Sequence, residues 1–428
     1  MLFKEELLHF IWQFRLYQSL DLFSADGEKI RVVGVGQHNK NAGPDFLYSK
    51  IQIGLAEWVG HVEIHLTGQD WYQHQHDSDP AYNNVILHVI WENLIPCRRA
   101  DGTEIPTLIL SHYVDANVLV NYSELISSKR WIPCAKQLPE VDGLLKLNLL
   151  QRMSIERLEL KFDAVQKYLA SHQSDWEKAA FMLLCRSFGM KVNAEAFLKL
   201  AELIDIKLFQ KFRADKVKIE ALCFGQAGFL EEDEGDDYYL SLQLTYRHLK
   251  AVYHFNQMNA EEWKFLRMRP YNFPTYRIAQ LCCFYAEFPS FFSKIIEMDA
   301  ATNFTAFFKP FTMHVYWENH FRFSKTTNRH STNWSPAFIE HLVINCFSVL
   351  VFSYGKYSDN PMFIEKAIRW LSDLKPEKNS ITEKFKELGL QAKNASDSQA
   401  LLHLYARYCE KKNCLDCSIG LSILKRKI

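Results

Sequence analysis

The sequence has no excess of charge of either sign, because its 428 residues include 50 Lys and Arg and 50 Asp and Glu. Without net positive charge, the chain is not expected to bind nucleic acid through a broad, non-specific electrostatic field. No apolar run reaches the length of a membrane span, and the N-terminus is amphipathic and charged, unlike a signal peptide. Cysteines are few, ten in all, and several stand in apolar settings, which fits a reducing cytosol. We therefore expect a cytoplasmic protein that does not cross a membrane.

Apolar residues are abundant. They make up 48% of the chain, and aromatic residues make up 14%, which is ample for packed cores. A single core usually stops growing well before 428 residues, so two or three domains are expected.

The pattern of apolar residues changes along the chain. Residues 1–140 carry short alternating runs separated by Gly, Asn and Pro, which indicates strands. From about Leu144 the apolar residues recur at helical spacing nearly to the end. We predict an α+β protein with an α/β domain over 1–140 and a helical region over 141–428 that divides near residue 300. The predicted helices are Asp175–Phe188, Ala194–Leu203, Leu208–Phe224, Tyr238–Phe255, Arg277–Phe288, Pro336–Tyr354, Asn360–Leu374 and Asp397–Lys411.

A predicted hairpin carries the most informative residues. Two alternating stretches, Asp45–Ile53 and Trp58–Leu66, are joined at residues 54–57. Strand alternation places Glu63 and His65 on one face together with His61, and Asp45 opens the partner strand. Two carboxylates that converge on a strand edge can hold Mg²⁺ or Mn²⁺ beside a water molecule to be activated. A register slip of one residue would move Glu63 and His65 to the opposite face.

This arrangement resembles the PD-(D/E)xK nuclease superfamily. The resemblance implies an αβββαβ core like that of restriction endonucleases. The core would consist of a helix over Leu2–Leu20, strands over Ile30–Val35, Asp45–Ile53 and Trp58–Leu66, a partly helical crossover over Asp70–Tyr82 and a strand over Val85–Trp91. It also implies that Asp45 and Glu63 bind the metal and that His65 stands where the family has a catalytic Lys.

The superfamily often places a further acid on its first helix. Glu6 flanks the apolar stripe predicted for that helix, whereas Glu5 is expected to point away from it, so Glu6 is the candidate. The stripe consists of Phe3, Leu7, Phe10, Phe14 and Tyr17. The alternative is that Glu6 is a solvated residue near the positive end of the helix dipole.

Histidines are concentrated near this hairpin. His61, His65, His74, His76 and His88 fall within 28 residues. We expect His74 and His76, in the crossover, to contact substrate, and His88, in mid-strand, to be a buried structural residue. Three imidazoles and a carboxylate would also suit a zinc hydrolase, although no HExxH signature is present.

Two further motifs lie outside the predicted α/β domain. Cys409, Cys414 and Cys417 follow His403, and together they could hold a structural Zn²⁺. Iron–sulfur ligation and packed, unligated thiols are the alternatives.

The second motif runs from Arg267 through Arg269 to Arg277 and combines arginines, aromatics and two prolines. Arg267 and Arg269 suit phosphate groups, but an interdomain strap would use the same residues. Gly34-x-Gly36 lacks the spacing of a dinucleotide-binding loop, so no such cofactor is expected. The acidic run over residues 231–237 is expected to be a solvated loop.

The whole chain also resembles a narrower group. Gly34-x-Gly36-x-x-Asn39 and the segments GPDF, GHVEIH, DWYQHQHDSDPAYNNVILHVIW, FGQAGFL and RMRPYNFPTYRIAQL look like an uncharacterised bacterial family with a domain of unknown function. That resemblance implies a bacterial cytosolic protein and no established activity.

Two hypotheses of function remain open. The first is a metal-dependent nuclease or phosphodiesterase that acts on nucleic acid. The second is a catalytically silent nuclease-like fold that binds nucleic acid or protein, which the replacement of Lys by His65 and the neutral net charge both favour. The sequence does not indicate an oligomeric state.

Overall fold

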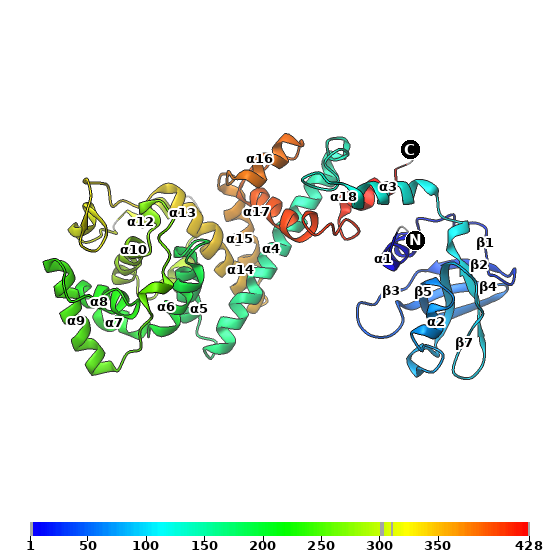
Figure 1. Cartoon of the computed structure of the whole chain (residues 1–428), viewed down its shortest axis with the longest axis horizontal. Helices are drawn as coiled ribbons and strands as arrows, with labels where there is room; N and C mark the ends of the chain where they lie inside the picture. The colour runs from blue at the N-terminus through cyan, green and yellow to red at the C-terminus, as the bar shows by residue number, and fades with distance from the viewer. Residues whose placement is uncertain (1–2, 300–303, 310, 427–428) are drawn as a thin grey trace. The chain divides into compact units, whose positions relative to one another are not determined.

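The computed structural model describes residues 3–299, 304–309 and 311–426, and its contacts divide the chain into two compact units (Figure 1). The sheet unit comprises Met1–Leu149, Glu387–Leu390 and Leu404–Ile428. The helical unit comprises Leu150–Lys386 and Gln391–His403. The chain is thus a mixed α and β protein with a helical C-terminal region. Its last segment, however, is grouped with the sheet and not with the helices that precede it.

The sheet unit is built on seven strands in the order β1-β2-β4-β5-β6-β9, with β3 paired to β4. Strands β2, β4 and β5 form antiparallel pairs, whereas β6 runs parallel to β5 and β9 runs parallel to β6. The strands are β1 (Leu22–Phe23), β2 (Lys29–Gly34), β3 (Gln37–His38), β4 (Phe46–Ile53), β5 (Ala56–Thr67), β6 (Val85–Glu92) and β9 (Thr107–Ile109), and a separate pair is formed by β7 (Cys97–Arg98) and β8 (Glu104–Ile105).

The first helix and the crossover complete the element order expected from the sequence. α1 spans Glu5–Gln13 and contacts β5. The crossover from β5 to β6 contains α2 (Asp70–Gln73) and a short 3₁₀ turn (Pro80–Tyr82). Between α1 and the crossover the chain forms five strands, of which the two-residue β1 and β3 were not expected from the sequence, and β6 then runs parallel to β5.

α1 is shorter than the predicted Leu2–Leu20, and two predictions about its side chains are wrong. The helix ends because Arg15 takes a left-handed backbone conformation with φ of 50°. Its buried face is formed by Leu7, Leu8, Phe10, Ile11 and Trp12, which leaves Glu6 exposed and Glu5 half-buried. Glu5, and not Glu6, consequently faces the sheet.

The central part of β5 is covered on both faces. Residues 62–65 are all buried, whereas Trp58 and Val59 at the start of the strand are exposed. Strands with parallel neighbours are normally covered on both sides, so the buried stretch begins where β5 meets β6. Glu63 and His65 are polar residues within that buried stretch.

The C-terminal segment packs on a helix that the sequence analysis did not predict. α3 (Ala116–Ser127) begins at Asp115, whose carboxylate accepts a hydrogen bond from the backbone N–H of Asn117. α18 (Ser418–Leu424) lies against it (Figure 1), and the Asn121 amide donates to the carbonyl oxygens of Ile423 at 3.2 Å and Arg426 at 3.0 Å. These bonds attach the C-terminal segment to the sheet unit.

The helical unit has one large aromatic-rich core. α4 (Gly143–Ser171) carries the chain into it. The predicted helix over Leu208–Phe224 is two helices, because the Asp215 side chain caps a new one by accepting from the backbone N–H of Lys218. The other helices are α5 (Trp176–Phe188), α6 (Ala194–Leu203), α7 (Lys207–Phe212), α8 (Lys216–Gln226), α9 (Asp237–Tyr253), α10 (Pro274–Glu287), α11 (Phe291–Glu297), α12 (Phe304–Phe308), α13 (Pro336–Leu342), α14 (Ser348–Tyr357), α15 (Pro361–Asp373), α16 (Ser380–Glu387) and α17 (Ala395–Leu404).

The continuous helical stretch Pro336–Tyr357 is long and apolar enough to cross a membrane by length and composition. The sequence analysis did not anticipate this. Because 72% of its apolar window is buried inside the protein, the stretch has the character of a core helix. The cytoplasmic location stays a prediction.

Candidate functional site

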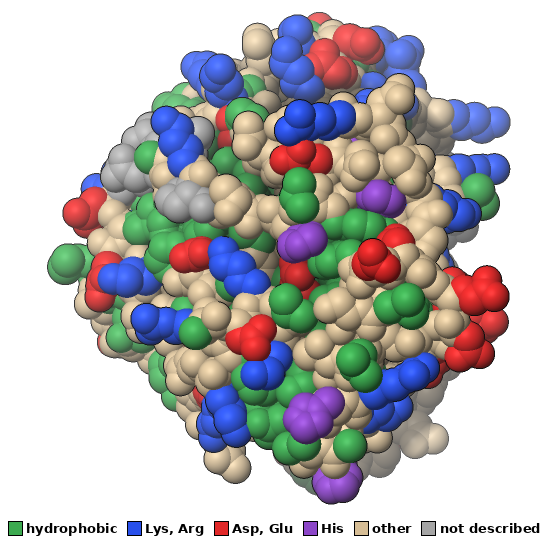
Figure 2. Space-filling model, turned by 90° about the vertical axis from the view of Figure 1, so that its left-hand side faces the viewer, with side chains coloured by type: hydrophobic (Ala, Val, Ile, Leu, Met, Phe, Trp, Pro, Cys, Tyr) green, Lys and Arg blue, Asp and Glu red, His purple; other side chains and the backbone are tan. Residues whose placement is uncertain are grey.

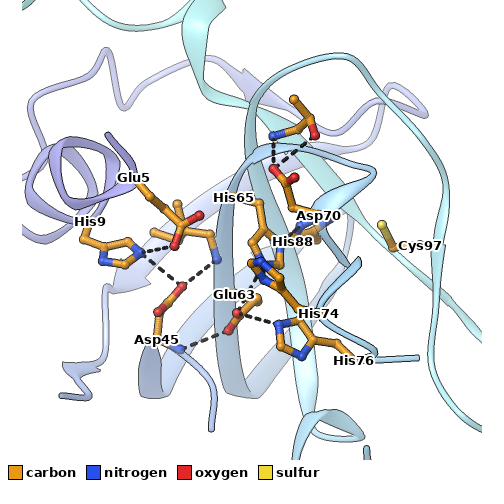
Figure 3. A network of polar contacts seen from close by, with 12 residues as sticks. Glu5, His9, Asp45, Glu63, His65, Asp70, His74, His76, His88 and Cys97 are labelled. Atoms are coloured by element: carbon orange, nitrogen blue, oxygen red, sulfur yellow. Dashed lines mark hydrogen bonds and ion pairs between the residues drawn. The ribbon is translucent and has the colours of Figure 1, made fainter. Parts of the chain in front are cut away.

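Asp45, directly before β4, and Glu63, on β5, lie side by side, and each carboxylate accepts a hydrogen bond from the backbone of the other segment (Figure 3). Glu63 Oε2 accepts from the Asp45 backbone N–H at 3.1 Å, and Asp45 Oδ2 accepts from the Ile64 backbone N–H at 2.9 Å. This reciprocal pairing holds both side chains at one point of the sheet. The sequence-based expectation that they converge therefore agrees with the geometry.

α1 supplies two more residues at this point. His9 Nε2 lies 3.2 Å from Asp45 Oδ2 and 3.7 Å from Glu5 Oε1. The ligand atoms of Glu5, His9 and Asp45 all lie within 4.8 Å of one another, close enough to bind one cation. Sequence reasoning missed this pair, although Glu5 and His9 are four residues apart and such residues share a helix face.

A chain of histidines lies on the other side of Glu63 (Figure 3). His65 Nδ1 is 2.9 Å from His88 Nε2, and His65 Nε2 is 3.2 Å from His74 Nδ1. Glu63 Oε1 lies 3.5 Å from His65 Nε2 and 3.4 Å from His76 Nε2. The nitrogen ligands of His65, His74 and His76 form a second group within 4.8 Å.

Burial sets the protonation of these groups. Burial, and then the neighbouring Asp45 carboxylate, raise the pKa of Glu63 to about 9. Burial, and then the other imidazoles, lower the pKa of His65 to about 2, and burial lowers that of His88 to about 3. Burial lowers the pKa of His9, but the carboxylates of Asp45, Glu5 and Glu63 together raise it above its ordinary value. At neutral pH His65 is therefore neutral, whereas the pKa of His9 is shifted toward the charged form.

Of the other residues of the sheet unit that the sequence analysis named, His61 and Gly36 lie outside this network, whereas His88 belongs to it through His65. His61 is near the backbone of Tyr48, with Nδ1 3.4 Å from its N–H. His88 is fully buried as predicted, although its Nδ1 has no partner among the described residues. Gly36 has a φ of 87°, and a side chain there would lie 2.4 Å from the Ser49 hydroxyl, so this glycine serves a close backbone approach.

A known family model matches most of the chain. A family model described as "Protein of unknown function (DUF2851)" matches residues 5–380. The chain belongs to the DUF2851 family. No match was found among curated proteins or among solved structures. The match confirms the expected family of unknown function, and it includes every residue of the network described above.

The C-terminal cysteines lie beyond the matched part of the DUF2851 chain, and a fourth cysteine joins them. Cys134, Cys409, Cys414 and Cys417 line one small cavity of about 20 Å³ in the sheet unit. His403, which the sequence analysis grouped with the cysteines, instead lies 3.4 Å from Glu156 Oε2 in the helical unit. Cys134 therefore replaces His403 as the neighbour of the other three. The sulfur atoms do not form a group within 4.8 Å among the described residues, and zinc at this place stays a prediction.

The two predicted arginines lie in the helical unit. Arg267 and Arg269 are both exposed, but only Arg269 lines a large cavity there, together with Arg277. Contact with a substrate stays a prediction for both Arg267 and Arg269.

Proposed function

We propose that this protein is a metal-dependent phosphodiesterase of the nuclease type, with its centre at Asp45 and Glu63. The observation that carries the proposal is the pairing of these carboxylates across β4 and β5, with Glu5 and His9 facing them from α1. The order of the longer elements around them (α1, β2, β4, β5, the crossover and β6) supports the proposal, because the resemblance implies αβββαβ.

The residues present suit a divalent cation. Asp45 and Glu5 offer carboxylate oxygens within 4.8 Å of each other, and Glu63 beside Asp45 offers a third, a set that Mn²⁺ accepts as readily as Mg²⁺. A bound cation would activate water and offset the charge that develops on phosphate oxygens. Glu63 must release its proton to serve as a ligand, because its pKa is raised to about 9. Cation binding should therefore be accompanied by proton release.

His65 cannot reproduce the charge of the lysine it replaces. Its side chain is 1% exposed, and with a pKa lowered to about 2 it remains neutral. In this proposal His65 orients Glu63 by its contact at 3.5 Å. His9, which has a raised pKa and partial exposure, provides the positive charge beside the reacting phosphate.

A specific observation favours a second candidate metal. His65, His74 and His76 bring three nitrogen ligands together beside Glu63 Oε1, a set typical of Zn²⁺ and not of Mg²⁺. His74 is exposed, so this group has access to solvent. The reaction would again be hydrolysis, and the metal that supports it would be zinc.

The silent nuclease-like module remains the alternative from another class. It is favoured by the lack of positive charge on the His65 imidazole and by the protonation of Glu63 at neutral pH. In that case Asp45 and Glu63 would bind no metal, and their reciprocal hydrogen bonds would only lock the two strands together.

The deciding experiment is cleavage of single- and double-stranded DNA and RNA with Mg²⁺, Mn²⁺ or Zn²⁺ against EDTA. Wild type is compared with Glu63→Gln, Glu5→Gln and Glu6→Gln. Glu6 is the matched control, because it neighbours Glu5 on the same helix but is exposed and outside the network.

We expect cation-dependent cleavage that falls at least 100-fold in Glu63→Gln, more than 10-fold in Glu5→Gln and not at all in Glu6→Gln, since losing a metal ligand or its supporting residue costs 10- to 100-fold. Cleavage with Zn²⁺ alone would assign the metal to the histidine group. No cleavage and no cation binding by the wild type would refute the proposal in favour of the binding module.

A further inference from the structure

The helical unit contains a cavity of about 590 Å³ that the proposed catalytic site does not use. The volume falls within the range of small-molecule sites and far exceeds that of a single inorganic anion. Side chains from the segment before α10, from α10 and from α13 surround it. Its polar and aromatic lining includes Arg269, Tyr271, Asn272, Arg277, Gln280 and Trp334.

Arg277 is the unusual residue of this cavity. It is 5% exposed, and its guanidinium carbon lies 3.3 Å from the centre of the Phe338 ring. Its terminal nitrogens donate to Gln280 Oε1 at 2.6 Å and to Asn272 Oδ1 at 2.7 Å, while its Nε has no partner among the described residues. Both acceptors are neutral, so the charge of Arg277 is oriented but not neutralised.

A buried guanidinium normally has a carboxylate partner. Among the described residues, none forms an ion pair with Arg277, and burial lowers its pKa to about 9, which still leaves it charged at neutral pH. An uncompensated buried charge is costly, and an anion that entered the cavity would remove that cost. Of five N–H donors in the guanidinium, two are used by Gln280 and Asn272, which leaves donors for such an anion.

The rest of the lining indicates what accompanies the anion. Arg269 is exposed and provides a second positive charge at the cavity. Tyr271 is 44% exposed, and the indole of Trp334 is buried, with its Nε1–H unpartnered within the described part of the chain. Aromatic faces of this kind stack with planar rings such as nucleobases.

The one face of the molecule drawn in Figure 2 is not strongly basic. In the face drawn in Figure 2, basic and acidic side chains are interspersed. An anion would therefore be drawn to this cavity by the two arginines, and not by a broad positive field.

We propose that this cavity binds a nucleotide, with its phosphate on Arg277 and Arg269 and its base against the exposed ring of Tyr271. This inference does not depend on the proposed metal site. It assigns a ligand class to the arginine–proline segment, in which the sequence predicted phosphate contacts by Arg267 and Arg269.

The test is titration calorimetry of the full-length protein with the four ribonucleoside 5′-monophosphates, in EDTA. Inorganic phosphate and the matching nucleosides are titrated in parallel. Arg269→Gln and Tyr271→Ala change exposed side chains, so both proteins should fold, and Arg267→Gln is the matched control on the same segment. Arg277→Lys keeps the buried charge but loses the planar fork.

At least one nucleotide should bind, with an affinity tenfold or more above those of phosphate and of its nucleoside. Binding should weaken about tenfold in Arg269→Gln and more in Arg277→Lys, because each loses a charge-assisted hydrogen bond, while Arg267→Gln should bind like the wild type. The proposal is overturned if no nucleotide binds at about 5 mM, a concentration well above that expected for a specific site. It is also overturned if Arg269→Gln and Tyr271→Ala both bind like the wild type, or if phosphate alone binds as tightly as the nucleotides.

Discussion

Glu63→Gln should make the metal-free protein more stable in mild alkali. Glu63 has a pKa of about 9 in the folded protein against an ordinary value of 4.5. Between pH 6.5 and 8.5 the folded protein therefore holds a proton that the unfolded chain has lost. Under that condition the free energy of unfolding falls by about 1.4 kcal/mol for each pH unit.

Over these two pH units the loss attributable to Glu63 is about 2.7 kcal/mol. The glutamine side chain keeps the shape of Glu63 and an acceptor for the Asp45 N–H but has no proton to lose. In this variant the fall of unfolding free energy with pH that is due to Glu63 should therefore disappear. His65 and His88 are neutral in the folded protein and half protonated in the unfolded chain at pH 6.5, so they add a small gain of stability with rising pH, but they do so in both proteins. His9 has a raised pKa and adds its own loss of stability with rising pH, but it does so in both proteins.

The assay is urea unfolding in EDTA at pH 6.5, 7.5 and 8.5, followed by tryptophan fluorescence. The difference in unfolding free energy between Glu63→Gln and wild type should grow in favour of the variant by about 2.7 kcal/mol across the range. Parallel pH profiles for the two proteins would refute the reasoning, since they would mean that Glu63 is already ionised at pH 6.5. Added Mn²⁺ should stabilise the wild type more at pH 8.5 than at pH 6.5, and Glu63→Gln much less.

Three further outcomes are expected. In the folded protein the pKa values of His65 and His88 lie below their ordinary value of 6.5, so the free energy of unfolding should fall as pH drops from about 6.5 toward 3. In an acid unfolding titration, a His88→Gln variant should lose less of its unfolding free energy than the wild type. If the four-cysteine cavity holds zinc, plasma emission should find about one zinc per chain purified without chelator, and less than half in Cys134→Ser; equal zinc in both would exclude Cys134 as a ligand. Asp215→Ala should lower the free energy of unfolding by about 1 kcal/mol in thermal or urea unfolding, because α8 loses its cap. Asp205→Ala, which removes the acceptor of the Lys207 N–H in the loop before α7, is the comparison.

The sequence was a good guide to elements with strong patterns. The strands on either side of residues 54–57 were predicted within a few residues, and α6 was predicted with its bounds intact. The facing of Glu63 and His65 followed from strand alternation alone, and their contact at 3.5 Å agrees with it.

What the sequence did not reveal depended on contacts between distant segments. The buried face of α1 was assigned from a stripe that included Phe14 and Tyr17, which lie beyond the end of the helix. That choice placed Glu6 and not Glu5 toward the site. Cys134 is separated from Cys409 by most of the chain, so no spacing rule could join them.

The charge state of the site was likewise beyond sequence reasoning. The pKa of Glu63 depends on burial and on the distance to Asp45, and neither is visible in the sequence. The raised pKa of His9 depends on its contacts with Asp45 and Glu5, which the sequence does not show either.

The sheet unit is discontinuous in the sequence, since Leu404–Ile428 returns to it after the whole helical unit. During synthesis α3 is made before α18, so the face of α3 that contacts α18 stays uncovered until α18 has left the ribosome. A fragment that stops near residue 140 would keep that face exposed and would be prone to aggregate. A shortened chain for isolated study should instead join Leu149 to Leu404 through a short flexible linker, so that Asn121 regains the carbonyl groups of Ile423 and Arg426.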